Sequence, residues 1–272
     1  MAQQMDSKED LFIEGCRSFE KATQAAVKVS GSRLGIEHTG RQNRILTAFA
    51  KMISHAMTIQ LIYNHARGLD DNYGFLDHFS IATLTRSVID SAIMALYLSE
   101  PSLSKVEWDL RRQVLFLHDL TNRKRFLTAA YKSQNNTESE KDKREYKEAK
   151  TRIVNQILKC CTELTMSEER TLELSKGQLV FQNGVRGAIR EAGLDVVQFD
   201  FLYTYLSNHV HSHPVSLMRA KQHNISFERP SDFQFGMCGL CLESGAQYLD
   251  AATARVEAFT GHFDRDPNGH ID

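Results

Sequence analysis

Apolar residues recur three and four positions apart along almost the whole chain, and this spacing constrains the fold more than any other feature. It is the spacing of one face of an α-helix, whereas a half-exposed strand would alternate apolar and polar residues. No alternating run flanked by hairpin turns is present. The pattern therefore predicts an all-α fold, a helical bundle of long antiparallel helices. We expect long helices at about residues 7–30, 39–67, 73–100, 103–132, 196–211 and 231–263, and a charged helix that ends near residue 164.

Local signals refine these limits. Ser231 and Gln234 form a capping-box pattern directly after Pro230, which predicts that the last helix begins there. Residues 167–193 have the pattern of short helices in an irregular connection.

A polar loop, SQNNTESEKDK, leads into the highly charged stretch EKDKREYKEAKTR. Charges of both signs alternate there at helical spacing, as in Glu140 and Arg144. We interpret this region as a solvated helical-hairpin arm with weak pairs between successive turns, the alternative being a binding surface.

The chain has 272 residues, four prolines and no Gly/Ser-rich stretch that resembles a linker. We therefore expect a single helical domain over residues 1–262 and a flexible C-terminal tail over residues 263–272. The polar N-terminus and the absence of about 18 uninterrupted apolar residues predict a cytoplasmic protein without a membrane partner. A formal charge of −1 argues against a strongly basic nucleic-acid binder, so that any basic surface must be local.

The five cysteines are expected to be reduced thiols, since their number is odd and no export signal is present. Cys160 with Cys161, and Cys238 with Cys241, could together supply four ligands to zinc. Both pairs lie in helical patterns where neighbouring cysteines point in different directions, so small core residues are the favoured interpretation.

Arg86 and Asp90 lie on the apolar face of the helix expected at 73–100, together with Phe79 and Ile89. Charged groups are costly at such a position unless they are paired. Two interpretations remain open: an ion pair between successive turns, or a charged pocket inside the bundle.

The segment 203–214 holds three histidines within five residues. His209 and His213 have a spacing that suits two metal ligands, but no nearby carboxylate completes a zinc site. A catalytic or anion-binding histidine is the favoured interpretation, and we expect no metal and no cofactor.

Two motifs carry a family resemblance. Arg86-Ser87-x-x-Asp90 runs into Tyr97-Leu98 and an arginine-rich helix, and Tyr205-Leu206-Ser207-x-x-x-His211 follows later. Over about residues 76–217 the chain resembles a family of uncharacterised bacterial helical proteins known only as a domain of unknown function. The same pattern is distantly similar to HEPN domains, α-helical bundles of toxin–antitoxin and phage-defence systems. Many of these are metal-independent ribonucleases with an Arg-x(4–6)-His motif, and they commonly dimerise.

Within this chain the best placed match to that motif is Arg112 with His118, inside a helix, although a solvated face is the favoured interpretation because Arg111 and Asp119 surround it. The element Asn208-x-x-His211 lacks an arginine directly upstream. Ribonuclease activity there would need Arg86 to supply the charge from another helix.

Two functions follow from these observations. In the first, the protein acts on RNA or a nucleotide, with His211 as general acid or base, Arg86 stabilising the phosphorane charge and Asp90 orienting Arg86. Substrate-binding residues would then be Ser207, Asn208, Arg112 and His118. In the alternative, Arg86, Asp90 and His211 form a buried polar network in a non-catalytic interaction or oligomerisation module. Homo-oligomers are expected in both cases, and a partner protein is a further expectation.

Overall fold

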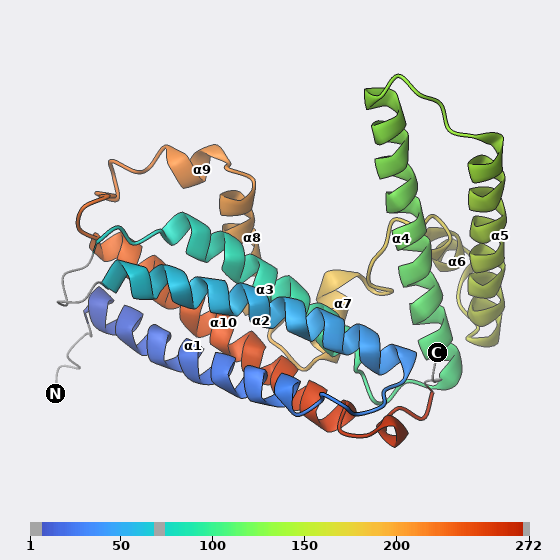
Figure 1. Ribbon diagram of the computed structural model, residues 1–272, viewed down its shortest axis with the longest axis horizontal. Helices are drawn as coiled ribbons and strands as arrows, with labels where there is room; N and C mark the ends of the chain where they lie inside the picture. The colour runs from blue at the N-terminus through green and yellow to red at the C-terminus, as the bar shows by residue number, and fades with distance from the viewer. Residues whose placement is uncertain (1–6, 68–73, 269–272) are drawn as a thin grey trace. The chain divides into compact units, whose positions relative to one another are not determined.

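The computed structural model describes residues 7–67 and 74–268 (Figure 1). All regular structure in these residues is helical, with ten α-helices and no strand, which confirms the predicted all-α fold. The short helices expected within 167–193 are present as α6 (Glu168–Leu174) and α7 (Gly184–Glu191).

The chain forms two compact units, residues 1–99 with 192–272, and residues 100–191. The single domain expected from the sequence stays a prediction, because two compact units can still unfold together. Each unit is described by itself below.

The first unit is a bundle of four long helices: α1 (Lys8–Gly31), α2 (Gly40–Arg67), α3 (His78–Leu98) and α10 (Asp232–Phe259). In Figure 1, α1 runs along α10, and α3 contacts both α2 and α10. A further helix, α8 (Val196–Val210), packs against α3, and the short α9 (Pro214–Leu217) follows it. Large side chains without exposed surface fill the interior, among them Phe12, Phe19, Phe49, Ile59 and Ile89.

Two glycines allow α1 and α10 to approach closely. A Cβ atom at Gly15 would lie 3.0 Å from the backbone oxygen of Gly239. Cβ atoms rarely come so near another backbone, so a larger residue at either position would push the two helices apart.

The capping box predicted at Ser231 is confirmed. The Ser231 hydroxyl accepts a hydrogen bond from the backbone N–H of Gln234, and the Gln234 side chain accepts one from the backbone N–H of Ser231. The buried Gln234 amide also donates to the carbonyl oxygens of Leu76 and Ser226. One side chain therefore fixes the start of α10 and the segment that leads into α3.

The expected flexible tail is anchored over part of its length. Asp266 is buried, with one carboxylate oxygen 3.2 Å from Nη1 of Arg41 and the other 2.7 Å from the hydroxyl of Thr39. The prediction that the flexible tail begins at residue 263 is therefore corrected, because a buried ion pair anchors the chain as far as Asp266. Residues 269–272 lie outside the described residues.

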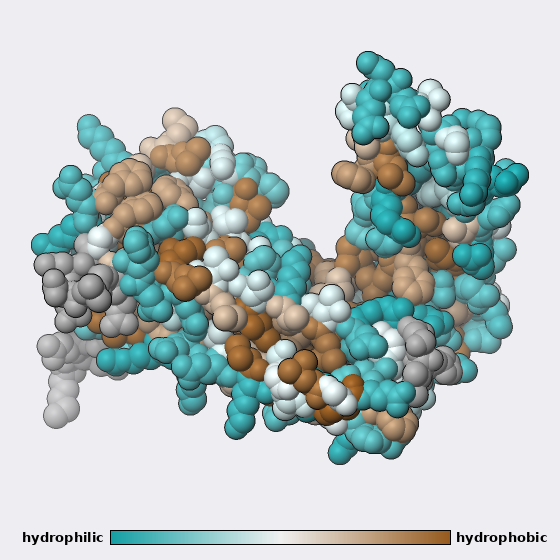
Figure 2. Space-filling model, viewed as in Figure 1, coloured by the Kyte–Doolittle hydropathy of each residue, from teal (hydrophilic) through white to brown (hydrophobic). Residues whose placement is uncertain are grey.

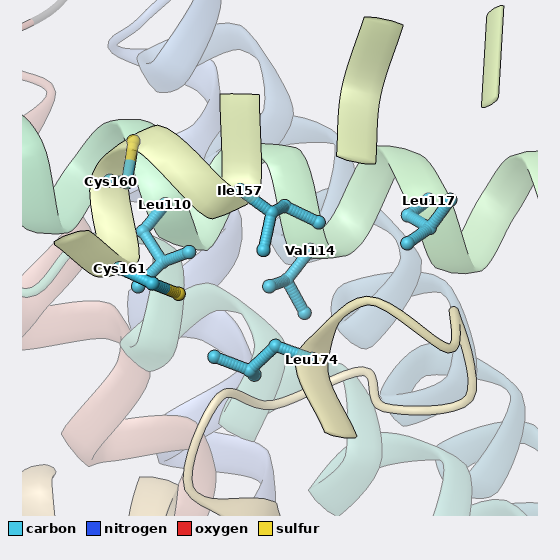
Figure 3. Packing of buried hydrophobic residues seen from close by; sticks show 7 residues of the cluster. All are labelled: Leu110, Val114, Leu117, Ile157, Cys160, Cys161 and Leu174. Atoms are coloured by element: carbon cyan, nitrogen blue, oxygen red, sulfur yellow. The ribbon is translucent and has the colours of Figure 1, made fainter. Parts of the chain in front are cut away.

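In the second unit, α4 (Lys105–Ser133) and α5 (Glu140–Glu163) pack side by side as the predicted charged hairpin. Figure 3 shows the buried cluster between them, which α6 completes: Leu110, Val114, Leu117, Ile157, Cys160, Cys161 and Leu174. Hydrophilic side chains cover much of α5 in Figure 2. Glu140 pairs with Lys143, one residue before the expected Arg144.

All five cysteines are buried free thiols. Cys238 and Cys241 have no exposed surface, which confirms them as core residues. Burial raises the pKa of both thiols, that of Cys241 to about 12, so neither is a thiolate at neutral pH.

Two helical segments, Gly40–Ala66 and His78–Leu98, are long and apolar enough to cross a membrane by length and composition. Core helices of soluble proteins meet the same criterion, and 67% of the second segment is buried within the protein. The cytoplasmic location and the absence of a membrane partner stay predictions.

The contact of Asp266 with Arg41 gives a first test. We expect Asp266→Asn to lower the free energy of unfolding by about 3 kcal/mol, because it removes the negative charge next to a buried guanidinium. The matched control is Asp264→Asn, since Asp264 is 69% exposed and pairs only with His262 on the surface. Denaturant unfolding at pH 7 measures both, and equal stability of the two variants would contradict the anchoring role.

Candidate functional site

Helix α3 carries the first part of the site. Asp77 caps its N-terminus by accepting a hydrogen bond from the backbone N–H of Ser80, and His78 is its first residue. The helix is apolar around most of its circumference, which explains why it packs between α2, α10 and α8. His78 is consequently buried, with 1% of its surface exposed.

Helix α8 carries the second part. Asp195 caps it by accepting hydrogen bonds from two backbone N–H groups, and Phe199, Leu202 and Leu206 form its buried face. The neighbouring positions Tyr203 and Ser207 lie beside that face and are half-buried.

Arg86 joins the two helices. Its Nε lies 3.2 Å from an Asp90 carboxylate oxygen, its Nη1 donates to the Ser207 hydroxyl, and its Cζ lies 3.2 Å from the centroid of the Tyr203 ring. The ion pair expected between Arg86 and Asp90 is therefore present. The Arg86 side chain is 16% exposed and that of Asp90 is 48% exposed, so the pair lies at the edge of the bundle.

His211 is placed differently from the expectation. It is the C-cap residue of α8, its ring is exposed, and that ring stacks on His213 with centroids 5.5 Å apart. Among the described residues, Arg86 contacts Asp90 and Ser207, but no hydrogen bond or ion pair joins it to His211. The buried network of three side chains is not formed, since Asp90 and His211 are both exposed.

The other expected binding residues are separated. Asn208 donates to the carbonyl oxygen of Thr204 and lies 3.2 Å from Nδ1 of His213. Arg112 and His118 belong to the second unit, where Arg112 pairs with Asp109 and lines a groove between α4 and α5. Six residues along a helix place two side chains about 120° apart, so Arg112 and His118 lie on different faces of α4.

A cavity of about 240 Å³ lies at the end of α3 and α8, and we call it the histidine cavity. Side chains from α3, α8, the segment after α9 and the start of α10 line it, including His78, Tyr205, His209, Arg219, His223 and Phe233. His209 was predicted from the sequence as a possible metal ligand, whereas His78 and His223 were not predicted. A histidine at the first position of an otherwise apolar helix was the available signal for His78.

The rings in this cavity are in contact. The His78 and His209 centroids are 6.4 Å apart in an edge-on arrangement, and Tyr205 lies 5.1 Å from His209. Among the other lining residues, His223 stacks on Phe233, with centroids 3.9 Å apart and an angle of 13° between the planes, and Phe233 lies edge-on to His78.

Burial keeps the two central histidines neutral. It lowers the pKa of His78 to about 4, with a smaller contribution from the nearby His209, and it also lowers the pKa of His209. Neither ring nitrogen of His78 has a hydrogen-bond partner of good geometry, nor does Nδ1 of His209, although the Leu76 carbonyl lies near enough to the His78 ring to oppose part of the lowering of its pKa. Each neutral imidazole therefore has one or two ring nitrogens whose hydrogen-bonding capacity is not used by ordinary hydrogen bonds within the chain.

Metal binding would need a third ligand. Within the described part of the chain, no three His, Cys, Asp or Glu side chains lie close enough together to hold a metal ion. The pair of His209 and His213 considered from the sequence belongs to no such cluster among the described residues, and the His213 ring contacts the Asn208 amide.

A family model of unknown function, DUF5677, matches residues 42–227. The chain belongs to this family. No curated protein and no solved structure matches it. The DUF5677 region begins in α2 and ends after α9, and it includes Arg86, His211 and the three histidines of the cavity, whereas Phe233 lies beyond it. The family has no assigned activity, so function has to be argued from the site.

The lowered pKa of His78 makes stability depend on pH. Between pH 6.5 and about 4 the unfolded chain binds a proton that the folded chain excludes, so this contribution destabilises the fold as the pH falls through that window. When the pH falls from 7 to 4.5, we expect the free energy of unfolding of the wild type to decrease by about 2 to 3 kcal/mol more than that of His78→Phe.

Denaturant unfolding at both pH values measures this difference. His65→Phe is the matched control, because His65 is exposed and lies on α2 outside the cavity. It should keep the wild-type dependence on pH. Parallel curves for the wild type and His78→Phe would show that His78 is not held neutral by burial.

Proposed function

We propose that this DUF5677 protein acts on RNA or on a nucleotide without a metal ion, as a HEPN-like protein in stress or phage defence. Two observations support the proposal: Arg86 lies at the contact of α3 with α8, and His211 is the exposed C-cap residue of the same α8. Arg86 is held by Asp90, Ser207 and Tyr203. His211 follows Ser207 by four residues, so it lies above Ser207 on the same side of α8 and about 6 Å further along the axis.

The proposed chemistry uses these two groups. His211 is exposed and within reach of a phosphodiester bound at the helix end, where its ring serves as general acid or base for a ribose 2′-hydroxyl or the leaving oxygen. Arg86 stabilises charge on the phosphoryl oxygens, and Asp90 and Ser207 orient its guanidinium. The biological setting rests on the HEPN resemblance alone.

Cleavage of single-stranded RNA in excess EDTA tests the proposal. We expect the wild type to cleave and His211→Ala to be at least about 100-fold slower, which is the usual contribution of a general acid or base. Its melting temperature should match the wild type, because the exposed His211 ring makes no hydrogen bond in the fold. His55→Ala on α2 is the control. Equal cleavage by wild type and His211→Ala, or no cleavage and no RNA binding by the wild type, would overturn the proposal.

A second candidate is a non-catalytic helical interaction module. It is favoured by one observation: the guanidinium of Arg86 joins α3 to α8 through Asp90, Ser207 and Tyr203, which is what a structural role requires. In that case Arg86→Ala loosens α8 from α3 and lowers stability by about 1 to 3 kcal/mol, with no activity to lose.

Self-association is part of both candidates. Val197 and Phe201 on α8 are 79% and 65% exposed, and Leu240 on α10 is 41% exposed beside an apolar groove of about 260 Å³. We expect light scattering to give a homo-oligomer at micromolar concentration, and Phe201→Glu to shift it towards the monomer because a charge replaces apolar contact area. Leu61→Glu, on α2, is the matched control and should leave association unchanged. A monomeric wild type would contradict self-association.

A further inference from the structure

The histidine cavity contains polar atoms whose hydrogen-bonding capacity is not used within the chain. His78 is buried, lines the cavity, and has no partner for either ring nitrogen. Nδ1 of His209 is likewise buried without a partner. Such atoms are rare in folded proteins, because burial removes the water that they would hydrogen-bond and no protein group replaces it. A ligand that supplies the missing hydrogen-bond partners therefore gains binding free energy.

The chemistry of the walls restricts that ligand. Two imidazoles that are neutral at pH 7 offer a donor and an acceptor but no charge, which suits a neutral group with adjacent acceptor and donor atoms. The lining also includes the rings of Tyr205 and of the stacked pair His223 and Phe233. Flat aromatic walls favour a planar ligand that stacks on them.

Size and charge restrict it further. At about 240 Å³ the cavity lies below the usual range for drug-sized ligands, so it suits a single small ring system. Arg219 is the only Arg or Lys side chain among its lining residues, and Arg219 is exposed. A ring that enters the cavity can therefore leave an anionic substituent outside, next to the guanidinium.

We propose that the histidine cavity binds the base of a nucleotide, with His78 and His209 hydrogen-bonding the edge of the base and Arg219 contacting the 5′-phosphate. This inference rests on the proposed function and specifies which part of the substrate is recognised and where. His211 and Arg86 would act on the phosphodiester, whereas the cavity selects the base.

Other occupants fit less well. An anion alone would meet two uncharged imidazoles in an apolar enclosure with one arginine on its exposed side. A metal ion would find two imidazoles and no third ligand within the described part of the chain. Ordered water would also hydrogen-bond the ring nitrogens. The experiment therefore has to distinguish a cavity that binds a ligand from one that holds only water.

The experiment is calorimetry on the full chain at pH 7.5 in EDTA, with the four ribonucleosides and their 5′-monophosphates. We expect at least one nucleoside to bind saturably and its monophosphate to bind about five times more tightly or better. His78→Phe should weaken both at least about tenfold, because it keeps the ring but removes both nitrogens. Its melting temperature should equal or exceed that of the wild type, since an unsatisfied polar group is lost from the interior.

Two controls assign the binding to the cavity. His55 on α2 also has a buried ring nitrogen without a partner, so His55→Phe makes the same chemical change outside the cavity and should leave affinity unchanged. Arg219→Ala should remove the advantage of the monophosphate over the nucleoside and leave nucleoside affinity intact.

Three results would overturn the inference. The first is the absence of saturable binding of any nucleoside or monophosphate up to about 10 mM, a concentration that corresponds to negligible affinity. The second is binding that His78→Phe leaves unchanged. The third is binding of zinc or inorganic phosphate alone that depends on His78. None of these measurements uses RNA cleavage. If the protein cleaves RNA but binds no nucleoside or monophosphate, this inference is wrong and the proposed function stands. If it binds them but does not cleave RNA, the proposed function is wrong and base binding by the cavity stands.

Discussion

The contact of Arg86 with α8 is the interaction on which the site depends. It combines an ion pair to Asp90, a hydrogen bond to the Ser207 hydroxyl and stacking on Tyr203, so one guanidinium fixes both the distance and the register of α8 against α3. Ser207 faces Arg86 and, one half-turn later on α8, His209 contacts the residues at the start of α3. The two helices are therefore antiparallel, and this register brings His209 to His78.

That register separates two kinds of chemistry along one helix. The middle of α8 carries a charged, partly exposed contact, whereas its C-terminal end carries the half-buried His209, which lines the cavity together with the buried His78 of α3, and then the exposed His211. The difference in burial has an electrostatic consequence, because desolvation keeps His78 and His209 uncharged, whereas Arg86 forms an ion pair with Asp90 at the edge of the bundle. Recognition of a neutral ring and stabilisation of a charged group can thus occur a few residues apart.

Much of the fold was predictable from local pattern. The helical spacing of apolar residues located the long helices, although α3 begins at His78 and not at residue 73, and α10 ends at Phe259 and not near residue 263. The ion pair of Arg86 with Asp90 was one of the two interpretations that their spacing on one helix left open. The cavity did not, since His78, His209 and His223 are far apart in sequence and meet only through tertiary contacts. The anchored Asp266 was missed for the same reason, because its partners Thr39 and Arg41 lie at the other end of the chain.

The central claim is that α3 and α8 together present neutral, unpartnered imidazoles to a ligand. Nitrogen-15 NMR of the histidine rings tests it most directly, by following each ring through a titration with a ribonucleoside monophosphate at neutral pH. The account predicts that His78 and His209 are uncharged before addition, that their ring nitrogens shift together and saturate on addition, and that those of His55 do not move. A protonated His78 at neutral pH, or ring nitrogens of His78 and His209 that stay unchanged while the ligand binds elsewhere, would contradict it.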